Sequence, residues 1–144
     1  MNYIFCLSLV VAASLTTFAV SASDDQQSLE GSWLPAKAEL AAQPMPDAVL
    51  KTIGLQITKN EYHVLVAGEA DDGTWTIDPG AKPKGMTITG VKGPNAGKTF
   101  PAIYELKGDT LRVCYDLSGA KRPSEFKTVA GTQLYLVTYH RHRP

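Results

Sequence analysis

Turn-forming residues recur at short intervals along most of this chain, and their spacing limits its fold more than any other feature does. Lys59-Asn60 and Gly108-Asp109 are suited to two-residue hairpin connections, and Asp71-Asp72-Gly73 predicts another turn. The segments between these turns are short and contain many of the branched and aromatic residues that favour strands. We expect strands over 29–40, 54–58, 61–67, 74–78, 85–91, 102–107, 110–116 and 132–141.

Strands with this spacing predict an all-β protein, specifically a small antiparallel β-barrel of about eight strands. Closure into a barrel pairs the two edge strands, which would otherwise be open to pairing with other chains. We expect at most one short helix, over 47–53, where Asp47 is a suitable N-cap.

The N-terminal segment does not follow this strand pattern. Residues 4–20 are apolar apart from Ser and Thr, and Val20-Ser21-Ala22 closes the run with residues that suit signal peptidase. We therefore expect a signal peptide over 1–22, export to the periplasm or the extracellular space, and one domain over 23–144. An uncleaved membrane anchor is the alternative, because the run is nearly long enough to span a bilayer.

Signal cleavage would leave Cys114 as the only cysteine of the exported chain, because Cys6 lies in the apolar run. An internal disulfide is then excluded, so stability depends on packing. Cys114 lies between Val113 and Tyr115 in an expected strand, without the cationic neighbour that would lower its pKa. We expect a half-buried structural thiol and not a nucleophile.

The chain has 14 basic and 14 acidic residues, so its formal net charge is zero. It therefore lacks the strong positive field that favours nucleic acids. The acidic residues are concentrated before residue 79 and the basic ones after it. One possibility is that the surface has two opposed charged faces. The alternative, which we favour, is that neighbouring strands interleave the acidic and basic halves of the chain in space, so that their fields cancel. We expect no nucleic-acid partner, no membrane association after signal cleavage, and a monomer.

The turn at Gly108-Asp109 predicts the register of one hairpin. Pairing Lys107 with Thr110 places Tyr104 opposite Val113, with Leu106–Leu111 and Ala102–Tyr115 on the same apolar face. The other face then carries Glu105 opposite Arg112, and Ile103 opposite Cys114. This pattern is typical of an antiparallel sheet with one face on a core and the other largely in water.

The opening Leu29-Glu30-Gly31-Ser32-Trp33 resembles the Gly-x-Trp start of the first strand in lipocalins and other calycin barrels. The rest of the chain after residue 22 resembles an uncharacterised family of exported lipocalin-like domains that is abundant in planctomycetes. The motifs that carry this second resemblance are Asp78-Pro79, Pro83-Lys84, the run from Ile103 to Cys114 that reads Ile-Tyr-Glu-Leu-Lys-Gly-Asp-Thr-Leu-Arg-Val-Cys, Arg122-Pro123-Ser124-Glu125-Phe126, and Arg141.

The resemblance implies a lipocalin-like barrel, but it implies no activity, because a fold does not determine function. In calycins the first and last strands pair antiparallel, which would bring Trp33 near Arg141 as a structural plug at one end. Two features depart from the family pattern. Pro35 lies within the first strand, which we expect to bend there, and the end of the chain is rich in His.

Several residues suggest chemistry but lack the context that it needs. Gly93–Thr99 resembles a phosphate-binding loop, yet Lys92 stands where the first Gly is required, and a strand follows instead of a helix. His140 and His142 point the same way in a strand, and His63 would have to join them to bind a metal. No Gly-x-Ser-x-Gly motif is present. We expect no enzyme, no cofactor and no metal site.

The function that remains is a non-catalytic binding module for a small apolar molecule, or a scaffold. The alternative is a protein-binding module, such as a periplasmic protease inhibitor. A barrel of this size either packs its interior with side chains or encloses a ligand, and packing is slightly favoured. If the interior is open, the residues expected to line it are Tyr62, Val64, Trp75, Ile77, Tyr104, Val113 and Tyr115.

Overall fold

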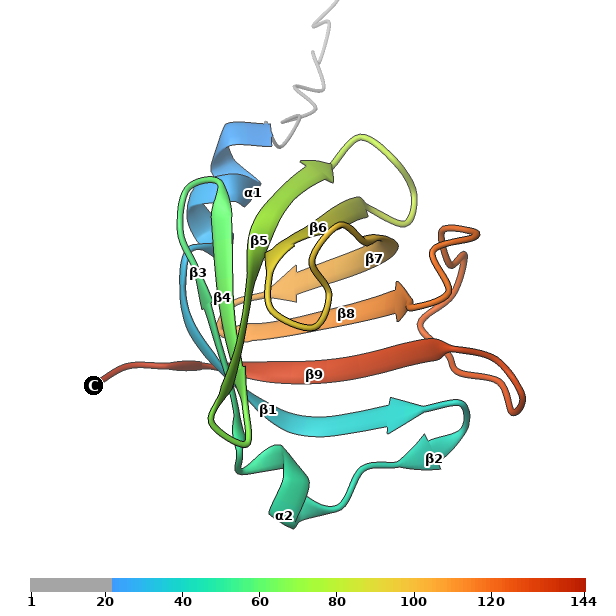
Figure 1. The fold of residues 1–144 in the computed structure, drawn as a ribbon. Coiled ribbons are helices and arrows are strands. Elements are labelled where there is room, and N and C mark those ends of the chain that lie inside the picture. The colour runs from blue at the N-terminus through green and yellow to red at the C-terminus, as the bar shows by residue number, and fades with distance from the viewer. Residues whose placement is uncertain (1–21) are drawn as a thin grey trace, which may run out of the picture.

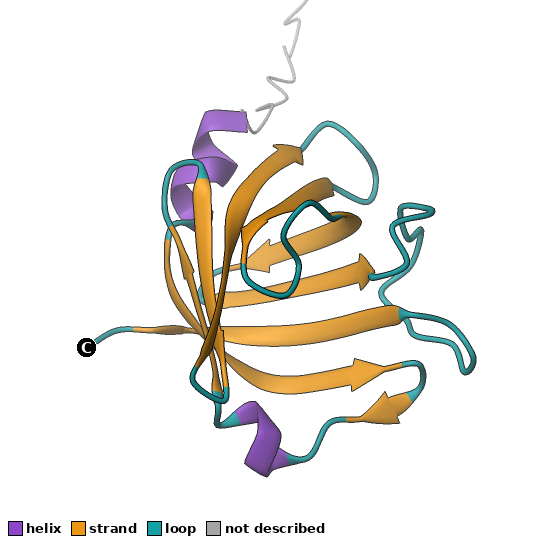
Figure 2. Ribbon diagram, viewed as in Figure 1, coloured by secondary structure: helices purple, strands orange, loops and turns teal. Residues whose placement is uncertain are grey.

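The structure is a computed structural model that describes residues 22–144. The expected signal peptide lies outside the described residues except for Ala22. Figure 1 shows the strands curving around a common interior with α1 at one end, and Figure 2 separates strands from helices by colour. The elements are α1 (Ala22–Leu29), β1 (Gly31–Leu40), β2 (Gln43–Pro44), α2 (Asp47–Leu50), β3 (Ile53–Ile57), β4 (Glu61–Val66), β5 (Glu69–Asp78), β6 (Gly85–Lys92), β7 (Thr99–Lys107), β8 (Thr110–Asp116) and β9 (Leu134–His142).

The barrel is closed by β1, which pairs with strands on both sides. From β3 to β9 each strand is antiparallel to the next, and β1 pairs with both β3 and β9. Within residues 22–144, eight strands form this closed barrel. The short β2 pairs with the C-terminal end of β1 and is not part of the barrel. The predicted all-β antiparallel barrel is confirmed. The described chain has a second short helix, α1, besides the one expected near Asp47.

Pro35 interrupts the pairing of β1 with β9, as its missing N–H predicts. The register shifts between Pro35 and Lys37, so that Ala36 has no residue opposite it. Such a bulge bends a strand, which here helps β1 to reach β3 at one end and β9 along most of its length.

The β7–β8 hairpin has the predicted register, with Tyr104 opposite Val113 and Glu105 opposite Arg112. The expectation that its outer face is largely in water is wrong for Ile103 and Cys114, which are both fully buried. The loop over 117–133 contacts this face of the hairpin, where the Sγ of Cys114 donates to the carbonyl oxygen of Lys127 at 3.6 Å. Only a non-local segment could produce this burial, so Cys114 is more buried than its strand position predicted.

The turn expected at Asp71-Asp72-Gly73 is absent, because all three residues lie inside β5. The chain turns instead at Ala67 and Gly68, where φ is 50° and 83°. A Cβ on Gly73 would lie 2.1 Å from the carbonyl oxygen of Thr89 and 2.6 Å from the ring of Tyr62. Gly73 is therefore needed for close packing and not for a turn.

The helix α1 ends at Leu29, where the first strand was expected to begin, and β1 begins at Gly31. It contacts the barrel at several points around one end: the Gln26 side chain donates to Lys59 O at 2.5 Å, and Lys84 Nζ donates to Asp25 at 2.8 Å. The side chain of Leu29 is fully buried. Because these contacts belong to the β3–β4 turn and to the start of β6, α1 covers this end of the barrel (Figure 1).

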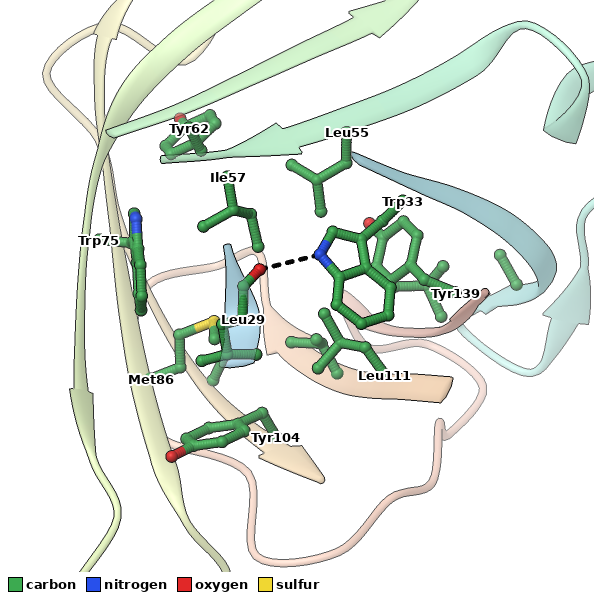
Figure 3. Packing of buried hydrophobic residues seen from close by; sticks show 14 of the residues in the cluster. Leu29, Trp33, Leu55, Ile57, Tyr62, Trp75, Met86, Tyr104, Leu111 and Tyr139 are labelled. Atoms are coloured by element: carbon green, nitrogen blue, oxygen red, sulfur yellow. Dashed lines mark hydrogen bonds between the residues drawn. The ribbon is translucent and has the colours of Figure 1, made fainter. Parts of the chain in front are cut away.

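The interior beneath α1 is filled by side chains. Figure 3 shows Trp33 in this packing, with its Nε1 donating to the carbonyl oxygen of Leu29 at 2.9 Å. Tyr104 and Leu111 are also buried there. Dense packing at this end leaves the opposite half of the barrel as the place where a ligand could enter.

Candidate ligand-binding cavity

A cavity of about 390 Å³ occupies the half of the barrel away from α1. Its wall reaches Val66 and Glu69 beside the β4–β5 turn, and Pro94 and Asn95 in the β6–β7 loop. The β4–β5 turn lies at the opposite end of β4 from the β3–β4 turn that contacts α1. The barrel is thus closed at one end and hollow towards the other.

Apolar and aromatic side chains form most of the wall because inward-facing positions alternate along each strand. The volume lies within the range of small-molecule sites, about 300–1,000 Å³. The strand residues in the wall are Ile53, Leu55, Ile57, Tyr62, Val64, Val66, Glu69, Asp71, Trp75, Met86, Ile88, Phe100, Leu111, Val113, Tyr115, Tyr135 and Tyr139, and loops add Pro94, Asn95 and Leu117.

The lining predicted from the sequence is found in part. Tyr62, Val64, Trp75, Val113 and Tyr115 all line the cavity. Ile77 and Tyr104 do not line it. The packed interior that was slightly favoured is found beneath α1, whereas the other half of the barrel contains the cavity.

Tyr104 and Ile77 were expected in the lining but lie elsewhere. Tyr104 faces inward beneath α1, where its hydroxyl donates to the Asp25 carboxylate at 2.5 Å. Ile77 is near the end of β5 and packs against the core while partly exposed. Both belong to the filled half of the barrel, since α1 shortens the space that the alternation pattern would leave open.

Sequence reasoning missed most of the wall. The alternation that identified Tyr62 and Val64 extends to Leu55 and Ile57 in β3, which could have been found in the same way. Asp71 and Asn95 could not, because one was assigned to a turn and the other to an open loop. They meet at the cavity, where Asn95 Nδ2 donates to Asp71 Oδ2 at 2.6 Å.

The tyrosines of the cavity keep their protons. Burial, with a smaller contribution from Asp71 and Asp72, raises the pKa of Tyr62 to about 12. Burial also raises the pKa of Tyr115 and of Tyr139 above the ordinary value. The rings of Tyr115 and Tyr135 stack with 5.7 Å between their centres. The wall therefore offers aromatic faces and neutral hydroxyls.

At the closed end, Arg141 lies over Trp33 as expected, with its Cζ 4.3 Å from the centre of the indole ring. The guanidinium also donates to the carbonyl oxygens of Ser28 at 2.6 Å and Glu30 at 2.8 Å, and to Asp109 at 2.9 Å. These bonds join β9 to the C-terminal end of α1. The pair therefore seals the barrel and does not face the cavity.

The other residues considered for chemistry lie apart. His63 pairs with Asp72 on the outer surface, while His140 contacts Thr110 at 3.3 Å. Burial raises the pKa of the Cys114 thiol, which keeps it from becoming a thiolate. No group of three His, Cys, Asp or Glu in residues 22–144 is arranged to hold a metal ion.

Comparison with known proteins adds no relative. No protein family, no curated protein and no solved structure matches the chain. In the part of the chain that the structure describes, no helix has the length and apolar character needed to cross a membrane. The cavity therefore provides the main argument about function.

Proposed function

We propose that this protein is a non-catalytic, exported binding protein that holds a small, largely apolar molecule inside its barrel. The observation that carries the proposal is the cavity of about 390 Å³ with apolar and aromatic walls. Transfer of an apolar ligand into such a space removes its surface from water, which favours binding by about 25 cal/mol per Å².

The two halves of the barrel support this function in different ways. The end beneath α1 is filled by large side chains such as Trp33, so it forms a rigid floor. The cavity above it is lined by residues of seven of the eight barrel strands, β3 to β9. A hydrogen-bonded barrel holds these side chains in place before the ligand arrives, which lowers the entropic cost of binding.

Titration with N-phenyl-1-naphthylamine, a neutral dye whose fluorescence rises in apolar surroundings, tests whether the cavity accepts ligands. We expect saturable binding to the wild type and at least a tenfold loss in Val64→Trp, which fills the cavity. Leu65→Trp is the matched control, because Leu65 is 40% exposed and does not line the cavity. Equal dye binding by both variants, or none by the wild type, would contradict the proposal.

Export and family membership are parts of the same proposal. The apolar run over 4–20 supports export, and the motifs from Asp78-Pro79 to Arg141 support membership of the lipocalin-like family. Native mass spectrometry of protein purified from the exported fraction would identify what it carries. A bound small molecule supports the binding function, while a stoichiometric protein partner supports the alternative of a protein-binding module.

A further inference from the structure

Asp71 is an acidic side chain built into an otherwise apolar wall. It lies on the inward face of β5 with Trp75, and both line the cavity. Asp71 is only 8% exposed, and its partner in the neighbouring strand β4 is Val64, another lining residue. The next residue, Asp72, lies on the outer face and pairs with His63. The carboxylate of Asp71 therefore belongs to the cavity and not to the protein surface.

The two oxygens of this carboxylate have different surroundings. Oδ2 accepts the hydrogen bond from Asn95, whereas Oδ1 is buried without a hydrogen-bond partner among the described residues. A buried carboxylate oxygen without a donor is costly, which is why such atoms are rare in proteins. The carboxylate of Asp71 can therefore gain substantially from a ligand that brings a further donor to it.

The β6–β7 loop packs closely against this carboxylate. Gly93 has a φ of +94°, and a Cβ at this position would lie 3.2 Å from Oδ1 of Asp71 and 2.4 Å from the carbonyl oxygen of Ala70. A larger residue would not fit there without moving the loop. Because Gly93 has no side chain, the loop that carries Asn95 can approach Asp71 closely without displacing Oδ1.

The charges around the cavity select the kind of donor. Among the described residues that line it, Glu69 and Asp71 are acidic and none is basic. The charge of Asp71 also acts within the wall: burial is the larger cause of the raised pKa of Tyr62, and Asp71 is the next. A ligand with a carboxylate would be repelled by these groups, while a cation would be attracted.

We propose that the ligand is an apolar amine, whose hydrocarbon body fills the cavity and whose protonated nitrogen donates to the carboxylate of Asp71. This inference rests on the proposed binding function and specifies the ligand class for the same cavity. A charge-assisted N–H···O bond is about twice as strong as a neutral one. Aromatic faces in the wall, such as that of Tyr62, also favour a cation.

Displacement of N-phenyl-1-naphthylamine by three probes with the same chain tests the proposal: decylamine, 1-decanol and decanoate, each below its aggregation concentration at neutral pH. We expect decylamine to bind about tenfold to a hundredfold more tightly than 1-decanol, and decanoate to bind most weakly. In Asp71→Asn, decylamine should fall to the affinity of the alcohol. The matched control Asp72→Asn should keep the preference for the amine.

The outcomes separate the two proposals. If 1-decanol displaces the dye but the amine has no advantage, or if Asp71→Asn keeps that advantage, the amine inference is overturned and the binding function remains. If neither dye nor probe binds the wild type, both proposals fail. The ranking of the three probes on the wild type needs no variant, so misfolding of Asp71→Asn would not prevent the test.

Discussion

The hydroxyl of Tyr104 in β7 donates a hydrogen bond to the carboxylate of Asp25 in α1, with 2.5 Å between the oxygens and 79 positions between the residues. Lys84 donates to the same carboxylate oxygen at 2.8 Å. Asp25 is only 6% exposed, so these two donors replace the hydrogen bonds that its carboxylate would otherwise make to water. The bond therefore fastens the N-terminal helix to the floor of the barrel.

We first predict that Tyr104→Phe destabilises the protein by about 1–3 kcal/mol, because it leaves Asp25 with one donor fewer in a buried position. Tyr104→Ala should cost about 3–5 kcal/mol by emptying an aromatic site. Glu105→Ala is the control, since its partly exposed pair with Arg112 at 3.3 Å contributes only about 0.2–1 kcal/mol. Urea unfolding measures all three, and equal losses for Tyr104→Ala and Glu105→Ala would show that the assigned faces are wrong.

A second prediction concerns the plug. Arg141→Lys should destabilise by about 1–2 kcal/mol although it keeps the charge, because Lys cannot stack a planar group on Trp33 or donate in so many directions. Arg143→Lys is the matched control: Arg143 also bonds Asp109 at 2.9 Å, but its side chain is 73% exposed. Thermal unfolding of the two variants checks this, and a stable Arg141→Lys would argue against a role in sealing the barrel.

Close packing at Gly73 leads to a third prediction. Gly73→Ala should destabilise by several kcal/mol, on the order of 3, because its Cβ would overlap Thr89 and the ring of Tyr62. Gly54→Ala, in the neighbouring region of the barrel, should be nearly neutral, since the nearest atom to its Cβ is 4.0 Å away in Leu34. Similar unfolding free energies for the two variants would contradict this account of β5.

The fourth prediction is a loss of stability at alkaline pH. The pKa of Tyr62 rises from 10.0 to about 12 on folding, mainly through burial, and that of Tyr104 is also raised, first by burial and then by its bond to Asp25. Below pH 10 these phenols are protonated in both the folded and the unfolded chain. As the pH rises from about 10 to 12 the unfolded chain releases protons more readily, so the free energy of unfolding falls.

Ultraviolet absorbance of tyrosinate, followed together with circular dichroism, checks this fourth prediction. We expect tyrosinate to form mainly as the protein unfolds, and Tyr62→Phe to reduce the slope of stability against pH above 10. Ordinary titration of all tyrosines near pH 10 with the fold intact would be the contrary result.

Fifth, the exported protein should begin at or near Ser23. The prediction follows from the apolar run over 4–20 and from Val20-Ser21-Ala22, and it is checked by N-terminal sequencing of secreted or periplasmic material. A chain that retains Met1 would indicate an uncleaved anchor instead.

Local pattern in the sequence was enough to predict much of the barrel. The hairpin between β7 and β8 was predicted residue by residue, because a two-residue turn and the alternation of side chains allow one register. The bend at Pro35 followed from a missing backbone donor. The contact between Trp33 and Arg141 followed only from the resemblance to calycins, since 108 positions separate the two residues.

The cavity was decided by tertiary structure. The sequence by itself determined which strand positions share a face, since side chains alternate with a period of two. It did not determine which part of that face is filled, because this depends on α1, a segment distant in sequence that covers one end. Asp71 resembled a turn residue and became part of the wall, because packing of Tyr62 on Gly73 outweighs the local preference of Asp and Gly for turns. Local preferences amount to tenths of a kcal/mol per residue, whereas burial of an aromatic ring contributes about 2–3 kcal/mol, so non-local packing prevails where the two conflict.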